Sequence, residues 1–325
     1  MTEDWQPTAD LSQLKSRASL LAAIRQFFAQ REVMEVETPL LCHTTGTDPN
    51  LAFFRADYAG TTPQTLFLQT SPEFAMKRLL AAGTGSIYQI CKAFRNGEAG
   101  RYHNPEFTIL EWYRVGFDLQ RLMDEVTALL TGYLTAFFPE LLVERASYRD
   151  WFLRYSGIDP LDFNAPVYRA FAEQIGLPEA AELCGDHHAL WLDLLFSHHL
   201  QNRLPVNTIC LIYDYPSVQS SLARLHPADP RICQRFEVFI NGVELGNGYY
   251  ELRDAVEQEA RFDAEIQFRT RQGLTPVCKD RRLLAALSQG LPDCSGVAIG
   301  LDRLLMVAGQ AQDISQVLAF PIGRA

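Results

Sequence analysis

The order of apolar and polar positions along the chain predicts helices and strands in mixed succession. Residues 11–31, LSQLKSRASLLAAIRQFFAQR, place apolar side chains at helical intervals and predict an amphipathic helix. The stretch 33–41, VMEVETPLL, is rich in β-branched residues and runs into an extended segment at Pro39, which predicts a short strand. Residues 118–138 return to helical spacing, and residues 140–200 lean towards helix.

Two further strands, joined by a loop, are predicted at 86–95 (SIYQICKAFR) and 106–115 (EFTILEWYRV). Both are rich in β-forming residues, and two glycines and a proline between them exclude a continuous helix. Alternation along the second strand places four side chains on one face: Phe107, Ile109, Glu111 and Tyr113. The loop and its edge carry Arg95, Arg101, His103 and Asn104.

This segment has two interpretations. Phe107 could stack on a planar base while Arg95 neutralises a phosphate. Alternatively, Phe107 and Tyr113 belong to the core and the loop is ordinary surface. The segment alone does not decide between them.

Residues 236–254, FEVFINGVELGNGYYELRD, predict a β-hairpin, because Asn241-Gly242 between two alternating runs is typical of a two-residue turn. That turn makes Glu237 and Glu244 diagonal neighbours on one face. Two carboxylates so close repel unless a cation lies between them, and Mg²⁺ is the natural candidate; a solvated strand face is the alternative. We expect one face to hold Val238, Ile240, Val243 and Leu245, and the other to hold Glu237, Phe239, Glu244 and Gly246.

The closing stretch 295–305, SGVAIGLDRLL, predicts a strand followed by a helix. Gly296, Ala298 and Gly300 alternate, so one face of the strand is almost bare of side chains. Such a face admits either a ligand or a closely packed backbone. Arg303 falls in the first helical turn, where backbone N–H groups already favour an anion.

Hairpins mixed with helices, without strict alternation, predict an α+β fold on an antiparallel sheet. We expect residues 1–325 to form one domain, in which residues about 145–185 could form a small helical insertion.

Composition narrows the class of protein. With 47% hydrophobic residues, the 325-residue chain can bury a large core, and a net charge of −10 argues against a protein that mainly binds polyanions. The seven cysteines are scattered without a CxxC pair, which indicates a reduced, cytoplasmic protein. No apolar run is long enough for a membrane span. The segments together offer the parts of a site that activates a carboxylate on ATP.

The segments MEVETPLL, FRN…RYHNPEFTILEWY and GVAIGLDRLLM resemble motifs 1, 2 and 3 of the class II aminoacyl-tRNA synthetases. The similarity is closest to lysyl-tRNA synthetase, through TSPE at 70–73, HNPEFT at 103–108, the FE…ELGNG hairpin and the terminal LAFP. It covers about residues 15–325.

Motif 1 starts near Val33, after a single helix, so we expect no N-terminal OB-fold that would read an anticodon. This shortened form resembles the elongation factor P lysine ligases. The resemblance implies ATP-dependent activation of lysine, preferably (R)-β-lysine, and transfer to the ε-amine of a lysine on elongation factor P. It also implies a homodimer built on motif 1, and makes tRNA an improbable acceptor.

The resemblance implies a role for each matching residue. Arg95 and Arg303 would be catalytic: Arg95 would hold the α-phosphate of ATP and the amino-acid carboxylate, and Arg303 would sandwich the adenine with Phe107. Glu237 and Glu244 would hold Mg²⁺. Further nucleotide contacts would come from Asn96, Gly97, His103, Asn104, Leu245 and Gly300. The amino-acid pocket would comprise Ser71, Pro72, Glu73, Tyr113, Asn247, Tyr249, Glu251 and Ala298.

Within that pocket, Glu73 would face one substrate amine, and Tyr113 and Glu251 would bind the distal ammonium. Three positions depart from the synthetase pattern, which has Glu at Gly97, Phe at Tyr249 and Gly at Ala298. Glu98 is a candidate substitute for the missing glutamate. We expect the Ala298 methyl to reshape the pocket against α-lysine and towards a β-amino isomer.

The implied reaction has two steps. The substrate carboxylate attacks the α-phosphorus of ATP and expels pyrophosphate, and the acceptor amine then attacks the mixed anhydride and releases AMP. The sequence singles out no general base. Alternatives are a lysyl-tRNA synthetase-like enzyme that charges tRNA, an asparagine synthetase of the class II type, and an inactive paralogue with a binding role.

Overall fold

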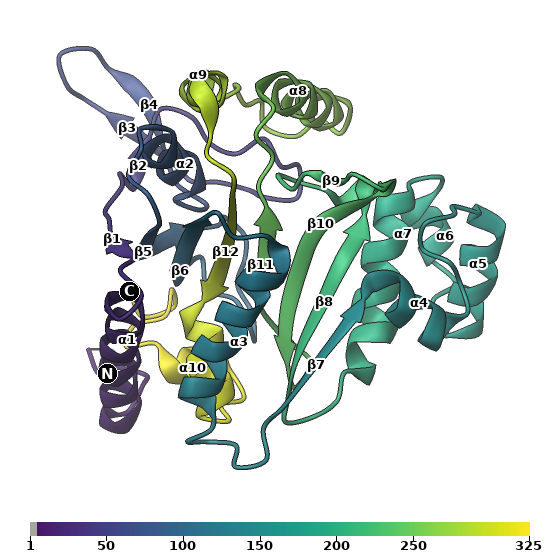
Figure 1. Cartoon of the computed structure of the whole chain (residues 1–325), viewed down its shortest axis with the longest axis horizontal. Coiled ribbons are helices and arrows are strands. Elements are labelled where there is room, and N and C mark those ends of the chain that lie inside the picture. The colour runs from purple at the N-terminus through teal and green to yellow at the C-terminus, as the bar shows by residue number, and fades with distance from the viewer. Residues whose placement is uncertain (1–4) are drawn as a thin grey trace. The chain divides into compact units, whose positions relative to one another are not determined.

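The computed structural model describes residues 5–325, which form two compact units. The first contains the described residues up to Asp118 together with Glu251–Ala325, and the second is Leu119–Tyr250. Each unit combines helices with a mainly antiparallel sheet, so the predicted α+β class is confirmed (Figure 1). The expectation of one domain over residues 1–325 stays a prediction.

The sheet of the first unit is built around β6, which pairs antiparallel with β5 on one side and with β12 on the other. The register places Glu111 opposite Gln89 on β5 and opposite Ala298 on β12. The elements of this unit are α1 (Leu11–Ala29), β1 (Met34–Glu35), β2 (Leu41–Cys42), β3 (Arg55–Tyr58), β4 (Gln64–Leu68), α2 (Glu73–Ala81), β5 (Ile87–Phe94), β6 (Glu106–Val115), α8 (Ala255–Arg271), α9 (Arg281–Gly290), β12 (Cys294–Gly300), α10 (Leu301–Ala308) and a 3₁₀ turn at Ile314–Val317.

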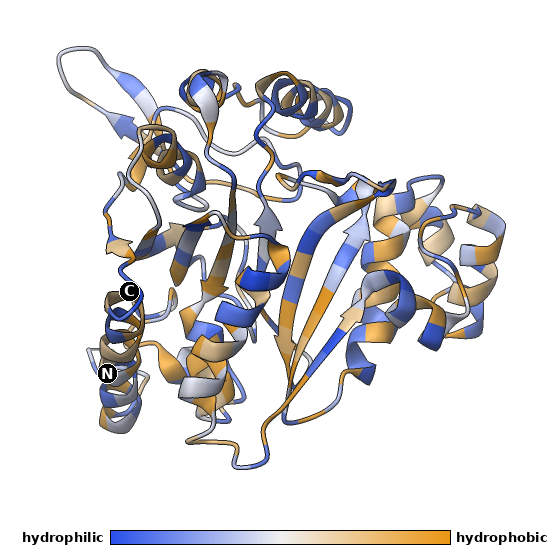
Figure 2. Ribbon diagram, in the orientation of Figure 1, coloured by the Kyte–Doolittle hydropathy of each residue, from blue (hydrophilic) through white to orange (hydrophobic). Residues whose placement is uncertain are grey.

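Helix α10 packs on β6, and all of its eight residues except Arg303 are buried. Its ribbon is accordingly coloured largely as hydrophobic (Figure 2). Asp302 on this helix accepts a hydrogen bond from the Thr108 backbone N–H (2.7 Å) and pairs with Arg17 of α1 (2.5 Å). One buried carboxylate therefore joins α1, β6 and α10.

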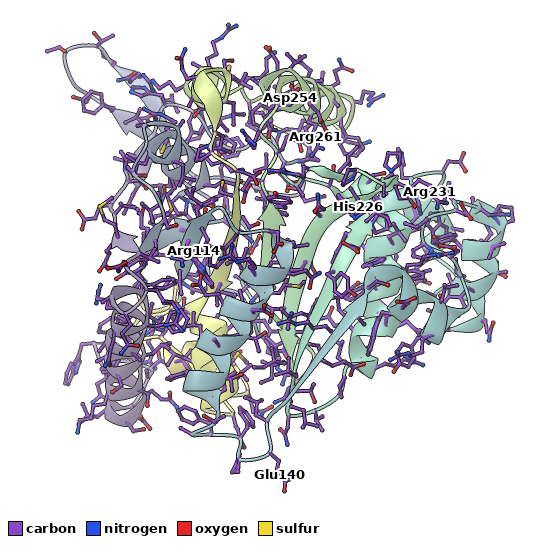
Figure 3. The ribbon with its side chains drawn as sticks, in the orientation of Figure 1. Arg114, Glu140, His226, Arg231, Asp254 and Arg261 are labelled. Atoms are coloured by element: carbon purple, nitrogen blue, oxygen red, sulfur yellow. The ribbon has the colours of Figure 1, made fainter. Side chains whose placement is uncertain are left out.

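Helix α8 begins at Asp254, whose side chain accepts hydrogen bonds from the backbone N–H groups of Val256 and Glu257. A side-chain cap of this kind satisfies donors that a helix start leaves unpaired. Asp254 and Arg261 mark the course of α8 in Figure 3, and Arg261 pairs with Glu257 one turn earlier (2.5 Å). Helices α2 and α8 both contact α9.

The sheet of the second unit has β8 pairing parallel with β7 and antiparallel with β10, which also pairs with β9 and β11. Its helices bury an aromatic cluster with Tyr148, Trp151 and Trp191 at its centre, and Phe239 of β10 joins it. The elements are α3 (Leu119–Leu134), β7 (Leu142–Ser147), α4 (Tyr148–Ser156), α5 (Ala165–Gln174), α6 (Ala180–Cys184), α7 (His188–Leu195), β8 (Thr208–Pro216), β9 (Leu225–His226), β10 (Asp229–Ile240) and β11 (Val243–Tyr250).

The predicted hairpin forms with Asn241 and Gly242 in its turn, both at positive φ (51° and 74°), and Phe239 lies opposite Glu244. Beyond that pair the register shifts, and Val238 lies opposite Gly246. The placement of Gly246 on the face of the two glutamates was therefore wrong. Its cause is a β-bulge, because one extra residue in β11 exchanges the faces of all residues that follow it.

Most predicted elements are confirmed: α1, β5, β6, α3 and the closing β12–α10 pair. The helix-leaning stretch 140–200 does contain α4 to α7, but it opens with the strand β7, which the sequence did not indicate. The possible insertion at about 145–185 stays a prediction. None of the helices in residues 5–325 is long and apolar enough to cross a membrane.

We predict that Asp302→Ala lowers the free energy of unfolding by about 3–5 kcal/mol, because it leaves the half-buried Arg17 and the Thr108 N–H without their shared acceptor. Chemical denaturation measures this loss. The control is Glu106→Ala, which removes the exposed Lys92–Glu106 pair (3.3 Å) and should cost less than about 1 kcal/mol. Equal effects of the two variants would contradict the role given to Asp302.

Candidate active site

A buried group of ionisable side chains lies in the first unit, where α2 approaches β6. Glu73 and Lys77 stand one turn apart on α2. Glu111 and Tyr113 share one face of β6, as the alternation predicted. Glu251 is fixed by a hydrogen bond from its backbone N–H to the Cys294 carbonyl (3.1 Å). We call these five residues the carboxylate cluster.

Lys77 bridges two members of the carboxylate cluster. Its Nζ lies 2.6 Å from Glu73 Oε1 and 2.6 Å from Glu251 Oε2, and its side chain is only 2% exposed. Burial alone would lower the pKa of Lys77, but the charges of Glu251 and Glu73 outweigh burial and raise it above its ordinary value. Lys77 is therefore a permanent buried cation that sets the spacing of the two carboxylates.

Glu111 has different partners. Its oxygens accept hydrogen bonds from the hydroxyls of Ser71 (2.7 Å) and Tyr113 (2.6 Å), which are neutral donors. Burial and the nearby charge of Glu73 raise the pKa of Glu111 to about 8, although the two hydroxyls act in the opposite direction. This carboxyl is therefore mainly protonated at neutral pH.

The predicted bare face of β12 borders this cluster. Gly296 lies opposite Tyr113, and a Cβ at Gly296 would stand 2.3 Å from the Tyr113 ring and 2.6 Å from Glu251 Oε1. Glycine is therefore required at position 296, because the Tyr113 ring and the Glu251 carboxylate occupy the space of a side chain. This agrees with the interpretation of the bare face as a site of close packing. Ala298, opposite Glu111, is half-buried.

The N-terminus of α2 orders the segment before the cluster. Pro72 is the residue that precedes the helix, and the Ser71 hydroxyl accepts a hydrogen bond from the Glu73 backbone N–H (3.1 Å). Ser71 thus touches both Glu73 and Glu111. The TSPE segment is a structural part of the site.

The loop between β5 and β6 places Arg95 against Phe107, with the guanidinium carbon 5.2 Å from the ring centroid. Its Nε is buried and has no hydrogen-bond partner among the described residues. Glu98 lies 3.9 Å from the Arg95 guanidinium. Gly97 has a φ of +81°, which a glutamate would adopt only with strain. The backbone at this position therefore favours glycine over the glutamate of the synthetase pattern.

Arg303 of α10 meets the same loop. Its Nε donates to the Tyr102 carbonyl (3.2 Å), and its terminal nitrogen lies 2.6 Å from His103 Nε2. Arg303 thus contacts the loop that also carries Arg95, and the roles that the resemblance gives to these residues stay predictions. Gly300 precedes the first residue of α10.

Asn104 is engaged within the chain. Its carbonyl oxygen accepts from the Ile322 backbone N–H (2.9 Å), and its amide donates to the Glu106 carbonyl (2.6 Å). This side chain ties the loop to the C-terminal segment. Asn96 is exposed and lines a cavity of about 410 Å³ that also includes Phe53 and Arg269.

Glu237 and Glu244, in the second unit, line one cavity of about 590 Å³, so their predicted common orientation is confirmed. Burial raises the pKa of Glu237, and the charge of Glu244 acts in the same direction. Mg²⁺ in proteins commonly takes one or two carboxylates and completes its shell with phosphate oxygens and water, and this pair fits that donor set. A group of three or more metal-ligating side chains is not found within residues 5–325.

Arg235 is the neighbour of this pair that the sequence did not suggest. Its terminal nitrogen lies 2.5 Å from Glu237, and its guanidinium carbon lies 4.8 Å from the Tyr215 ring centroid and 5.9 Å from that of Tyr249. Asn247 lies directly opposite Glu237 on β11. Leu245 is buried at the bulge.

Sequence reasoning did not assign Lys77 or Glu111 to the site. Lys77 follows Glu73 by four residues in TSPEFAMK, a spacing that joins opposite charges on a helix. Glu111 was placed on the face of Tyr113, but its apolar sequence surroundings were not used as a signal of burial.

The sequence of this chain matches a known protein family. The family model described as class II tRNA synthetases (D, K and N) matches residues 5–324. Similar curated proteins carry the name elongation factor P–(R)-β-lysine ligase. That of Vibrio cholerae is 49% identical over 325 residues and that of Vibrio parahaemolyticus 48% over 324, each across 99% of both chains. That of Pectobacterium atrosepticum is 45% identical over 327 residues, across 100% of this chain and 99% of its own.

The chain therefore belongs to the class II tRNA synthetase family and, within it, to the elongation factor P–(R)-β-lysine ligases.

We predict that Glu111→Gln reduces the pH dependence of stability between pH 5 and 8. The folded pKa of about 8 exceeds the ordinary 4.5, so the stability contributed by this carboxyl is complete below 4.5 and is lost as the pH rises through 8. Melting temperatures at pH 5 and pH 8 measure this, and the decrease should be larger in the parent protein. Identical decreases would contradict a protonated Glu111.

Proposed function

We propose that this chain is a ligase that activates (R)-β-lysine with ATP and transfers it to elongation factor P. Relatives with this name align with 45–49% identity along nearly all of both chains. The observation that carries the proposal is the carboxylate cluster, because it holds three carboxyl groups, two of them buried, around a single internal ammonium. A ligand with two ammonium groups complements that imbalance.

In this proposal the two amines of the substrate bind the carboxylate cluster. Glu73 faces one ammonium, and Glu251, Tyr113 and Glu111 surround the other. Ser71 and Pro72 hold the start of α2 in place. The aliphatic part of the substrate lies along the bare strand face that includes Ala298. Asn247 and Tyr249, on β11 of the second unit, are the remaining residues to which we assign a role in substrate binding.

ATP binds through the loop between β5 and β6 and through Arg303. Arg95 neutralises the α-phosphate. In support of this role, the buried Nε of Arg95 has no hydrogen-bond partner among the described residues and is thus available to a ligand. Phe107 and Arg303 stack on the adenine, and Asn96, Gly97, His103, Gly300 and the Leu245 backbone supply further contacts. Asn104 holds this loop against the C-terminal segment, because its side-chain oxygen accepts a hydrogen bond from the Ile322 backbone N–H.

Glu237 and Glu244 are the residues that would hold Mg²⁺, which when bound neutralises the phosphates and stabilises pyrophosphate as a leaving group. Arg235, whose terminal nitrogen lies 2.5 Å from Glu237, lowers the pKa of Glu237 and so opposes the effect of burial, which raises it. Both glutamates are half-buried and lie on paired β-strands, so their positions are fixed by the sheet.

The chemistry proceeds in two steps. The substrate carboxylate attacks the α-phosphorus and forms the acyl-adenylate with loss of pyrophosphate. The ε-amine of a lysine on elongation factor P then attacks the acyl carbon, and AMP leaves. Positioning and charge neutralisation carry the first step, because the protein forms no covalent bond with the substrate. We assign no general base to the second step.

We further propose a homodimer assembled through residues 33–41, as motif 1 implies. Met34, Leu40 and Leu41 are exposed there, and a partner subunit would cover them. Cytoplasmic location, inferred from the scattered cysteines, stays a prediction.

An acceptor assay tests the function. With labelled (R)-β-lysine and ATP, we expect label on elongation factor P and none above background on tRNA(Lys) offered in parallel. Label on tRNA would instead identify a tRNA-charging enzyme. AMP formation with neither acceptor labelled would support the activation site and refute the acceptor.

We predict that Ala298→Gly shifts the preference from (R)-β-lysine towards α-lysine by at least about tenfold in the ratio of kcat/KM values, since one methyl in a pocket is worth roughly 1–3 kcal/mol. Pyrophosphate release with each isomer measures the ratio. The control is Gly132→Ala, which adds a methyl in α3 with no atom within 4 Å. An unchanged ratio in Ala298→Gly would refute the role of this methyl.

A further inference from the structure

The three carboxylates of the carboxylate cluster are not equivalent. Lys77 contacts Glu73 and Glu251 at 2.6 Å each, so both have a cation. Glu111, which is 2% exposed, has no cationic partner among residues 5–325 and is held only by two hydroxyls. A buried carboxylate without a counter-charge is strongly disfavoured and takes up a proton instead.

The groups packed around Glu111 do not supply that counter-charge. On β5, Gln89 lies directly opposite and Cys91 is close enough for its pKa to respond to the Glu111 charge. On β12 the opposite residue is Ala298. Tyr113 and Cys91 both have raised pKa values, burial being the main cause, so neither carries a charge at neutral pH. The charged groups nearby are Glu73, Glu251 and Lys77.

In the free cluster, Glu73 and Glu251 both form ion pairs with the ammonium of Lys77, and Glu111 is neutral, so the cluster has two anionic groups and one cation. One ammonium group of a ligand is enough to neutralise it. A second ammonium would leave an excess positive charge in a buried site, unless Glu111 loses its proton and becomes the matching anion.

We propose that Glu111 recognises the second ammonium group of the substrate by releasing its proton to solvent, so that binding of a diamino acid, and not of a monoamino acid, is coupled to deprotonation. This inference rests on the proposed function, because the diamino acid is the substrate assigned there. Glu111 then acts as a specificity-determining residue: it is neutral in the free site and anionic in the complex.

The coupling predicts a definite pH dependence of binding. Because the free carboxyl is protonated up to about pH 8, the affinity for the diamino acid should rise about tenfold for each pH unit below that value, and level off above it. Tyr113 donates to Glu111 and thereby lowers its pKa. Tyr113→Phe should therefore move the plateau to higher pH, which a purely structural change would not do.

Titration calorimetry of the full chain with (R)-β-lysine, without ATP, tests this inference. At pH 7, in buffers of different ionisation enthalpy, we expect release of about one proton per site. Norleucine, which lacks the distal ammonium, should bind weakly and release none. Glu111→Gln mimics the protonated carboxyl and should bind the diamino acid more weakly, without proton release and without the pH dependence.

Two results would overturn the inference: binding of (R)-β-lysine by the parent protein without proton release, or the same release from Glu111→Gln. The parent protein alone decides the first, so the test does not depend on the folding of a variant. Labelling of elongation factor P by the same preparation separates the outcomes. Labelling without proton release refutes the inference and leaves the proposed function standing, whereas absence of labelling refutes the function itself.

Discussion

The buried ammonium of Lys77 is the constraint on which the organisation of the first unit depends. It holds Glu73 and Glu251 at 2.6 Å each, although these residues are far apart in the chain. Without that cation, the half-buried Glu73 and the buried Glu251 would repel, and the start of α2 could not lie against the strand that carries Glu111 and Tyr113. The same cation leaves Glu111 as the member of the cluster with hydroxyl partners only, within the described residues. The charges of Lys77, Glu73 and Glu251 thus serve both the packing of α2 and the proposed recognition of the substrate.

The sheets turn this arrangement into a fixed geometry. Cross-strand register places Gly296 beside Tyr113 and Ala298 beside Glu111, and the missing side chain at Gly296 leaves room for the Tyr113 ring and the Glu251 carboxylate. In the second unit the turn at Asn241-Gly242 places Glu237 and Glu244 on one face, and the β-bulge that follows Glu244 turns Gly246 to the other. The loop between β5 and β6 is held from α10 and from the C-terminal segment through Arg303 and Asn104. The side chains proposed to bind the substrates therefore lie on paired strands or on a loop that is held by hydrogen bonds.

Much of the fold was predictable because its signals are local. The turn at Asn241-Gly242, the alternation of residues 106–115 and the helical spacing of residues 11–31 depend on neighbours in sequence. What failed depends on distant contacts. The strand β7 gains its pairing from β8, more than sixty residues later, and the bulge at Leu245 depends on the pairing of β11 with β10. Lys77 and Glu111 were missed as site residues because their burial and partners exist only in the folded chain, and the roles of the motif residues came from resemblance.

The central claim is that the carboxylate cluster binds both amines of one diamino acid. A crystal structure of the chain with (R)-β-lysine and a non-hydrolysable ATP analogue tests it most directly. We expect one ammonium within hydrogen-bond distance of Glu73 and the other within reach of Glu111 and Glu251, with Lys77 still between Glu73 and Glu251. A substrate bound elsewhere, or one with an ammonium in solvent, would show that the cluster does not recognise both amines.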